Sequence, residues 1–117
     1  MTVVENEQLF LDLTVFDGLS DTRLEELREN GYLDKENENT EKAEVYIKDF
    51  VDSRSGEVID TLEELGSYFK DKGRVMYRAG LKSLMAMEVV LEFLASQMVI
   101  KRKRNGDYIK RNGINTP

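Results

Sequence analysis

The chain of 117 residues contains no cysteine and no histidine. Without cysteine it has neither a disulfide framework nor a thiolate metal site. Without histidine it lacks the commonest general base and the commonest metal ligand. Asp and Glu remain as acid–base groups, but no paired-carboxylate motif or phosphate-binding loop accompanies them. The composition therefore predicts a protein that is not an enzyme and that uses no metal and no cofactor.

Long apolar runs are missing as well. None reaches the roughly 20 residues that a helix needs to cross a bilayer, and Met1 to Glu5 do not begin a signal peptide. We therefore expect a cytoplasmic protein without membrane contact. The length predicts a single domain over residues 1–117, with an acidic α/β part at 1–60 and a basic part at 61–117.

The charge is divided unevenly along the chain. Residues 1–69 hold six Lys and Arg against 19 Asp and Glu, a net charge of −13. Residues 70–117 hold 11 against four, a net charge of +7, and the two parts together give −6. This asymmetry indicates a polyanionic partner for the basic part. The alternative is that the two parts neutralise each other across the fold.

The first half of the sequence suggests a strand, a helix and a hairpin. Apolar residues alternate over 9–16 and predict a strand, and Ser20 is suited to cap a helix over 21–30. Alternation over 43–51 and 57–59, around a turn that contains Gly56, predicts a β-hairpin. The polar segment 34–44 reads as a solvated loop, or alternatively as a docking surface that imitates phosphates.

Two helices are predicted in the second half. Thr61 and Glu64 form a capping box before a helix over 62–72 that ends near Gly73. Apolar residues at steps of three and four predict a second helix over 75–97. The members of this apolar stripe are Tyr77, Leu81, Leu84, Leu91, Leu94 and Met98. Within it, Gly80 is a natural corner and Ser83 a natural N-cap, which is typical of a helix-turn-helix.

A basic hairpin follows the second helix without a linker. Asn105-Gly106 tolerates the positive φ values of a tight type I′ turn, so strands over 99–103 and 108–111 are expected to pair. The sequence as a whole therefore predicts a small α+β domain whose C-terminal part is a winged helix-turn-helix.

The run from Ser83 to Arg104 resembles the C-terminal half of winged-helix regulators. It is similar to RepL-type replication proteins of plasmids and phages, which also carry an upstream turn like the one from Asp52 to Ile59. The resemblance implies nucleic-acid binding in the regulation of transcription or in replication of a phage or mobile element. It also implies which residues face the major groove: Lys82, Ser83, Met85, Ala86 and Glu88. Since Met85, Ala86 and Glu88 are poor readers of base edges, we expect contacts with the phosphate backbone instead.

The predicted nucleic-acid-binding residues are mostly cations, and DNA is expected ahead of RNA. They are Arg74, Arg78, Lys82, Ser83, Lys101, Arg102, Lys103, Arg104, Lys110 and Arg111. Arg74, Arg78 and Lys82 are spaced four apart and would share one face of an unbroken helix.

The same region also predicts contact with protein. Between Leu84 and Ala95 only Glu88 and Glu92 are charged, and a helix that is apolar nearly all round is buried on more than one side. We expect a homodimer interface that consists of Leu84, Met85, Val89 and Phe93, unless the N-terminal part of the chain covers this helix. The alternative function is an acidic interaction module, an inhibitor or adaptor that docks on a basic host protein, including as a DNA mimic.

Overall fold

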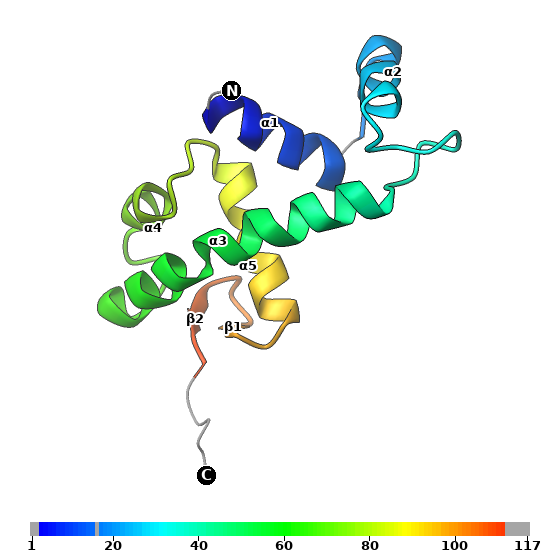
Figure 1. The fold of residues 1–117 in the computed structure, drawn as a ribbon. Coiled ribbons are helices and arrows are strands. Elements are labelled where there is room, and N and C mark those ends of the chain that lie inside the picture. The colour runs from blue at the N-terminus through cyan, green and yellow to red at the C-terminus, as the bar shows by residue number, and fades with distance from the viewer. Residues whose placement is uncertain (1–2, 16, 112–117) are drawn as a thin grey trace. The chain divides into compact units, whose positions relative to one another are not determined.

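The computed structural model describes residues 3–15 and 17–111, and within them it contains five helices and one antiparallel pair of strands (Figure 1). The helices are α1 (Val3–Thr14), α2 (Asp21–Glu29), α3 (Glu41–Leu65), α4 (Lys72–Ala79) and α5 (Leu84–Ser96). The strands are β1 (Ile100–Arg102) and β2 (Tyr108–Lys110). The α+β class is confirmed. The chain divides into two units, Met1–Phe50 and Val51–Pro117, and the division falls inside α3. A single domain over 1–117 stays a prediction.

The strand predicted over 9–16 is wrong, because residues 3–14 form α1; residue 16 lies outside the described part of the chain. Phe10 and Leu13, one helical step of three apart, are both buried. The Phe10 ring stacks on Phe50 of α3 with 4.0 Å between ring centroids. This packing within the first unit stabilises the helix, although the alternation of apolar residues is also compatible with a strand.

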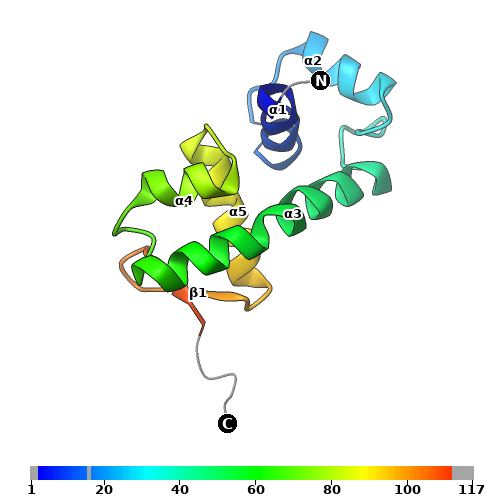
Figure 2. The same cartoon turned by 60° about the vertical axis from the view of Figure 1, so that its left-hand side comes forward.

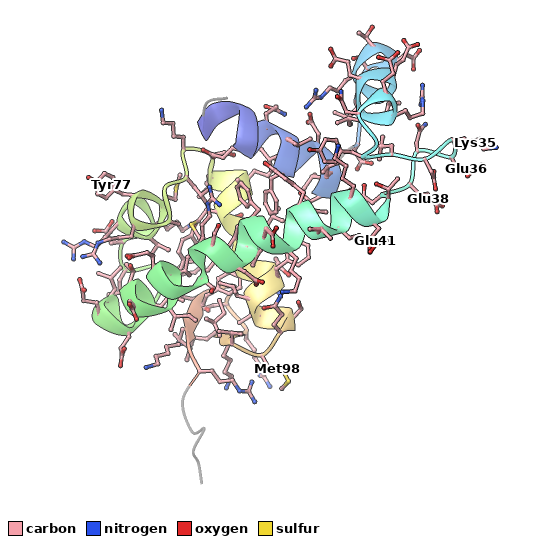
Figure 3. The ribbon with its side chains drawn as sticks, viewed as in Figure 1. Lys35, Glu36, Glu38, Glu41, Tyr77 and Met98 are labelled. Atoms are coloured by element: carbon pink, nitrogen blue, oxygen red, sulfur yellow. The ribbon has the colours of Figure 1, made fainter. Side chains whose placement is uncertain are left out.

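The helix predicted over 21–30 is confirmed as α2. The Ser20 hydroxyl accepts a hydrogen bond from Arg23 N at 3.1 Å, which is the expected N-cap. The segment after α2 is held by its own turns, since Asp34 Oδ1 accepts from the backbone N–H groups of Glu36 and Glu38, each at 2.9 Å. Figure 3 shows the side chains of Lys35, Glu36 and Glu38 pointing outward from this loop.

The hairpin predicted over 43–59 is wrong, because the whole segment belongs to α3. Buried and half-buried residues recur along it at steps of three and four: Ala43, Ile47, Phe50, Val51, Arg54, Val58, Thr61, Leu62 and Leu65. Gly56, which the predicted turn required at positive φ, has no positive φ and lies on the exposed side of the helix. Burial of a continuous apolar stripe stabilises the helix by more than one internal glycine destabilises it.

The helix predicted over 62–72 is also wrong. Thr61 is not an N-cap but lies inside α3, where its hydroxyl donates to Glu57 O at 2.6 Å. The helix ends at Leu65, and Gly66 follows with φ of 95°. The next helix, α4, begins at Lys72 with Asp71 as its N-cap.

The helix predicted over 75–97 is divided in two, at the corner that the sequence marked. Gly80 has φ of 71° and ends α4, and the Ser83 hydroxyl caps α5 by accepting from Ala86 N at 3.2 Å. Leu81, Leu91 and Leu94 are buried as predicted. Three predicted members are not part of the buried stripe, since Tyr77, Leu84 and Met98 are all exposed. Tyr77 is 82% exposed and points away from α4 (Figure 3).

The hairpin predicted over 99–111 is confirmed, and its register pairs Ile100 with Lys110 and Arg102 with Tyr108. The turn differs from the type I′ prediction. Gly106 N donates to Lys103 O at 2.9 Å, and of the Asn-Gly pair only Gly106 has positive φ (89°). This is the longer type of hairpin loop that places one left-handed residue before the second strand. Figure 2 shows α4 and the hairpin beside the C-terminal half of α3.

Among the described residues, no helix combines the length and the apolar character needed to cross a membrane.

Candidate nucleic-acid interface

The hairpin is fixed to the segment after α3 through Asp107, which is 5% exposed. One oxygen of its carboxylate accepts from two backbone donors, Phe69 N at 2.8 Å and Tyr108 N at 2.7 Å. A third bond joins Tyr68 N to Tyr108 O at 2.9 Å, so the backbone at Tyr68 lies alongside β2. These bonds hold the hairpin in one orientation relative to α3.

Hydrogen bonding outweighs burial in setting the charge of Asp107. Burial acts to raise the pKa of this carboxyl group, but the bonds from Phe69 N and Tyr108 N, together with Ser67 and the nearby charge of Lys103, lower the pKa below its ordinary value. The anchor is therefore a carboxylate at neutral pH, and its hydrogen bonds are of the stronger, charge-assisted kind.

Tyr108 joins the hairpin to α5. Its ring is buried and packs edge-to-face on Tyr68, with centroids 6.0 Å apart. Its hydroxyl donates to Glu92 of α5 at 2.8 Å. Burial and the bond to Glu92 together raise the pKa of Tyr108 to about 12. Asp107 and Tyr108 were not predicted as anchors, and the only local signal for them in the sequence is their place directly after Asn105-Gly106.

The hairpin presents four consecutive cations, all exposed, which we call the hairpin basic cluster: Lys101, Arg102, Lys103 and Arg104. Arg102 forms an ion pair with Glu92 at 3.7 Å, and Lys103 lies near enough to Asp107 to affect its pKa. Lys101 and Arg104 have no ion pair within the described part of the chain. The turn of the hairpin thus carries positive charge that the described residues only partly neutralise.

Other predicted cations are already paired inside the second unit. Arg74 and Arg78 of α4 both reach Glu64 Oε1, at 3.2 and 3.4 Å, and Lys110 pairs with Glu63 at 2.9 Å. Sequence offers no signal for these pairs, because they join α3 to elements that follow it through turns. The predicted face shared by Arg74, Arg78 and Lys82 does not form, since α4 ends at Ala79.

The remaining predicted residues lie near α5 or after β2. Lys82 and Arg111 are exposed, and Ser83 serves as the cap of α5. Of the residues predicted to face a major groove, Ala86 is fully buried and Met85 and Glu88 are exposed. For the predicted dimer interface, Leu84 and Met85 are exposed while Val89 and Phe93 are half-buried. The dimer itself stays a prediction.

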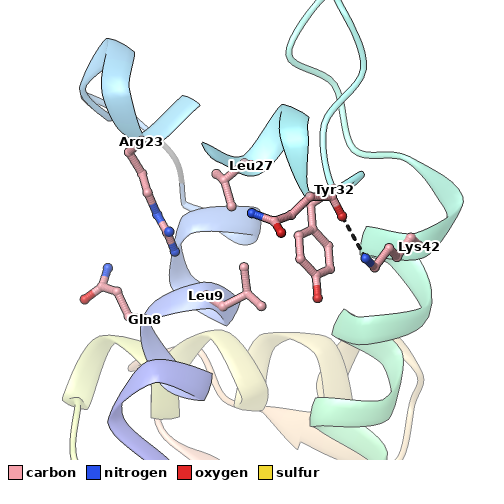
Figure 4. A pocket seen from close by; sticks show the side chains of 7 residues that line it. Gln8, Leu9, Arg23, Leu27, Tyr32 and Lys42 are labelled. Carbon is pink, nitrogen blue, oxygen red and sulfur yellow. Dashed lines mark hydrogen bonds between the residues drawn. The ribbon is translucent and has the colours of Figure 1, made fainter. Parts of the chain in front are cut away.

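A pocket of about 420 Å³ lies in the first unit, between α1, α2 and the start of α3 (Figure 4). Its two cations are already engaged. Arg23 pairs with Asp12 at 2.6 Å and with Glu26 at 3.1 Å. Lys42 donates to Asn30 O at 2.7 Å and lies 4.6 Å from the centre of the Tyr32 ring. Both cations that line this pocket therefore already interact with other residues of the first unit.

Within the described residues, no group of three or more Asp and Glu side chains is arranged to hold a metal ion. Comparison with known proteins adds no relative: no family model matches the chain, and neither the curated proteins nor the solved structures contain a match. Any function must therefore be argued from the geometry of the two units.

Proposed function

We propose that residues 51–111 are a winged helix-turn-helix, and that the hairpin basic cluster binds the phosphates of nucleic acid, DNA in preference to RNA. The observation that carries this proposal is a hairpin that is anchored through Asp107 and presents four exposed cations at its turn. We further propose a non-enzymatic regulator of transcription or accessory of replication from a phage or mobile element. This part rests on the resemblance of the run from Ser83 to Arg104 alone, because the segment from Asp52 to Ile59 is helical and does not form the upstream turn.

The order of elements supports the winged-helix interpretation. The C-terminal half of α3, then α4, a turn at Gly80 and α5 follow one another before the two strands. In a winged helix a third strand commonly pairs with the hairpin. Here the backbone at Tyr68 lies at the corresponding position, because Tyr68 N donates a hydrogen bond to Tyr108 O of β2. α5 has the place of the second helix of the helix-turn-helix, but its only charged residues are Glu88 and Glu92, so we propose that the hairpin and not α5 contacts the phosphates.

The side chains favour backbone contacts over base reading. α5 contains no Lys, Arg, Asn or Gln, the residues that most often form hydrogen bonds with base edges. Phosphate contacts carry no sequence information by themselves. We therefore propose binding that is largely independent of sequence, with the hairpin as its main source of affinity.

Fluorescence anisotropy with three unrelated duplexes, a single strand and an RNA tests this proposal. The double variant Lys101→Ala/Arg104→Ala should weaken binding to every duplex by a similar factor, about tenfold at moderate salt. The matched control is Arg74→Ala/Arg78→Ala, which removes the same number of cations from a site already paired with Glu64. Equal effects of the two variants, or strong preference for one duplex, would contradict the proposal.

The alternative function is an acidic interaction module that docks on a basic host protein. It is favoured by three exposed acids within the 34–44 segment, Glu36, Glu38 and Glu41 (Figure 3). Replacing these three with Gln should leave nucleic-acid binding unchanged or strengthen it. Under the alternative, the same change would abolish binding of the partner while nucleic acid is not bound at all.

A further inference from the structure

We propose that the exposed side of α5 is a docking surface for a basic amphipathic helix of a partner protein. We call this surface the α5 outer face and define it by Leu84, Met85, Glu88, Val89 and Glu92. The proposal does not rest on nucleic-acid binding by the hairpin, although the two surfaces adjoin at the ion pair between Glu92 and Arg102.

The α5 outer face leaves apolar side chains exposed. The opposite side of α5 is packed, with Ala86, Met87, Val90, Leu91 and Leu94 all buried. On the outer face, Leu84 remains 47% exposed and Met85 55% exposed. Methionine is a flexible side chain that adapts to varied apolar partners. Burial of this surface would be favourable for any occupant with an apolar stripe.

The α5 outer face is also negatively charged. No Lys or Arg occurs between Lys82 and Lys101, and the two charged residues of α5 are Glu88 and Glu92. Both are exposed. This combination repels a polyanion and favours an occupant that brings Lys or Arg beside its apolar residues. The outer face is therefore opposite in charge to the hairpin basic cluster.

The spacing of residues along the α5 outer face indicates the form of the occupant. Met85, Val89 and Glu92 lie on successive turns of one helix, which spans about 20 Å at 1.5 Å per residue. A helix laid against this stripe presents apolar anchors at steps of three and four. A helix with Leu at those steps and Lys on both flanks matches both the apolar residues and the carboxylates.

A second copy of this chain fits the outer face less well. A symmetric pair places the same patch on both sides of the interface, so each copy presents Glu88 and Glu92 to the other pair of carboxylates. α5 contains no cation that could offset them. Glu92 already accepts a hydrogen bond from the Tyr108 hydroxyl and pairs with Arg102, which leaves Glu88 as the acid to vary.

The probe for the test is a synthetic 18-residue helical peptide with Leu at positions i, i+4, i+7 and i+11 and Lys at the flanking positions. Glu88→Lys and Met85→Ser should each weaken its binding to the full chain by about tenfold or more. The matched control is Glu57→Lys, an identical charge change at an exposed position of α3. This control should alter affinity by less than about twofold, as a distant surface charge does.

Amide chemical shifts of the labelled protein identify where the peptide binds, and the expected changes cluster at residues 84–96. The proposal is overturned if the changes fall on the acidic residues 34–44 or if the control weakens binding as much as Glu88→Lys. It is overturned equally if a duplex shifts the amides of residues 84–88, which lie on the part of the outer face before the Glu92–Arg102 ion pair. Sedimentation of a wild-type dimer that Met85→Ser dissociates would assign the face to a second copy instead.

Discussion

At the scale of single residues, Asp107 is the side chain that fixes the position of the hairpin. Its carboxylate accepts two backbone N–H groups that the fold leaves without another partner among the hydrogen bonds described. A buried donor that loses its acceptor costs more than the bond itself contributes, since it was removed from water. The position of the hairpin relative to α3 thus depends on one side chain.

Replacing Asp107 with Asn should lower the free energy of unfolding at pH 7 by about 2 kcal/mol, the scale of charge-assisted bonds. Because the folded pKa of this carboxyl lies below its ordinary value of 3.8, its contribution is fully present above pH 3.8. It is lost as the pH falls through the lower folded pKa. Urea unfolding from pH 7 down to pH 2 measures this. A wild-type to variant difference that stays constant down to the lowest pH would contradict the assignment.

Two buried tyrosines predict how the stability of the fold changes at high pH. Burial, with the charge of Glu88 and Tyr108 as further causes, raises the pKa of Tyr68 to about 12, and the pKa of Tyr108 is also about 12. Unfolded phenols ionise near pH 10, so folding favours the protonated form. The stability is present below pH 10 and is lost as the pH rises towards 12.

The variant Tyr108→Phe provides the matched measurement. It removes one of the two shifted phenols and the bond to Glu92, so it should be less stable than wild type at pH 8 by about 1 kcal/mol. Between pH 9 and pH 11 it should then lose less stability than wild type does. Equal losses over that interval, measured by urea unfolding, would count against the burial of Tyr108.

At the scale of elements, the second half of the chain was the more predictable. Gly80, Ser83 and Asn105-Gly106 act through local backbone geometry, so the sequence places the corner, the cap and the turn. In the first half the helix over 21–30 was predicted correctly from its cap, but residues 9–16 and 43–59 were predicted wrongly because short alternation and helical spacing coexist there. Which of them prevails depends on what each face is packed against, and a single sequence does not contain that information.

The same limit applies to the candidate interface. The hairpin basic cluster is visible in the sequence as four successive cations, and the structure leaves them exposed. The pairing of Arg74 and Arg78 with Glu64 was not predictable, because it required the path of the chain between Leu65 and Lys72. Burial of Ala86 was not predictable either. It depends on which side of α5 faces the core, and the apolar stripe alone does not determine that side.

Gly56 distinguishes the observed helix from the predicted hairpin. In α3 its φ is not positive, and a Cβ placed there would meet nothing within 4 Å. Gly56→Ala should therefore stabilise the protein by about 0.5–1 kcal/mol, because alanine restricts the unfolded chain and favours helix. In a hairpin turn with positive φ, the same change would destabilise. Gly80→Ala is the control, since φ of 71° at Gly80 predicts a loss of stability; thermal unfolding compares both.

At the scale of the whole molecule, the divided charge of the sequence is only partly neutralised by ion pairs. Glu63 and Glu64 engage Lys110, Arg74 and Arg78, which accounts for three of the predicted phosphate-binding cations. Exposed pairs of this kind contribute little stability, about 0–1 kcal/mol each. Among the predicted phosphate-binding residues, these pairs engage Arg74, Arg78 and Lys110, whereas Lys101 and Arg104 of the hairpin have no ion pair with the described residues.

If the cations of the hairpin bind phosphates, the affinity for nucleic acid must depend strongly on salt concentration. Binding of the wild-type chain to one duplex should weaken linearly on a plot of log affinity against log salt concentration, through counterion release. Lys101→Ala/Arg104→Ala should flatten that slope by roughly one to two units, about one for each phosphate that is no longer neutralised, whereas Arg74→Ala/Arg78→Ala should leave it nearly unchanged. Absence of binding at low salt, or equal flattening by both variants, would contradict phosphate binding by the hairpin.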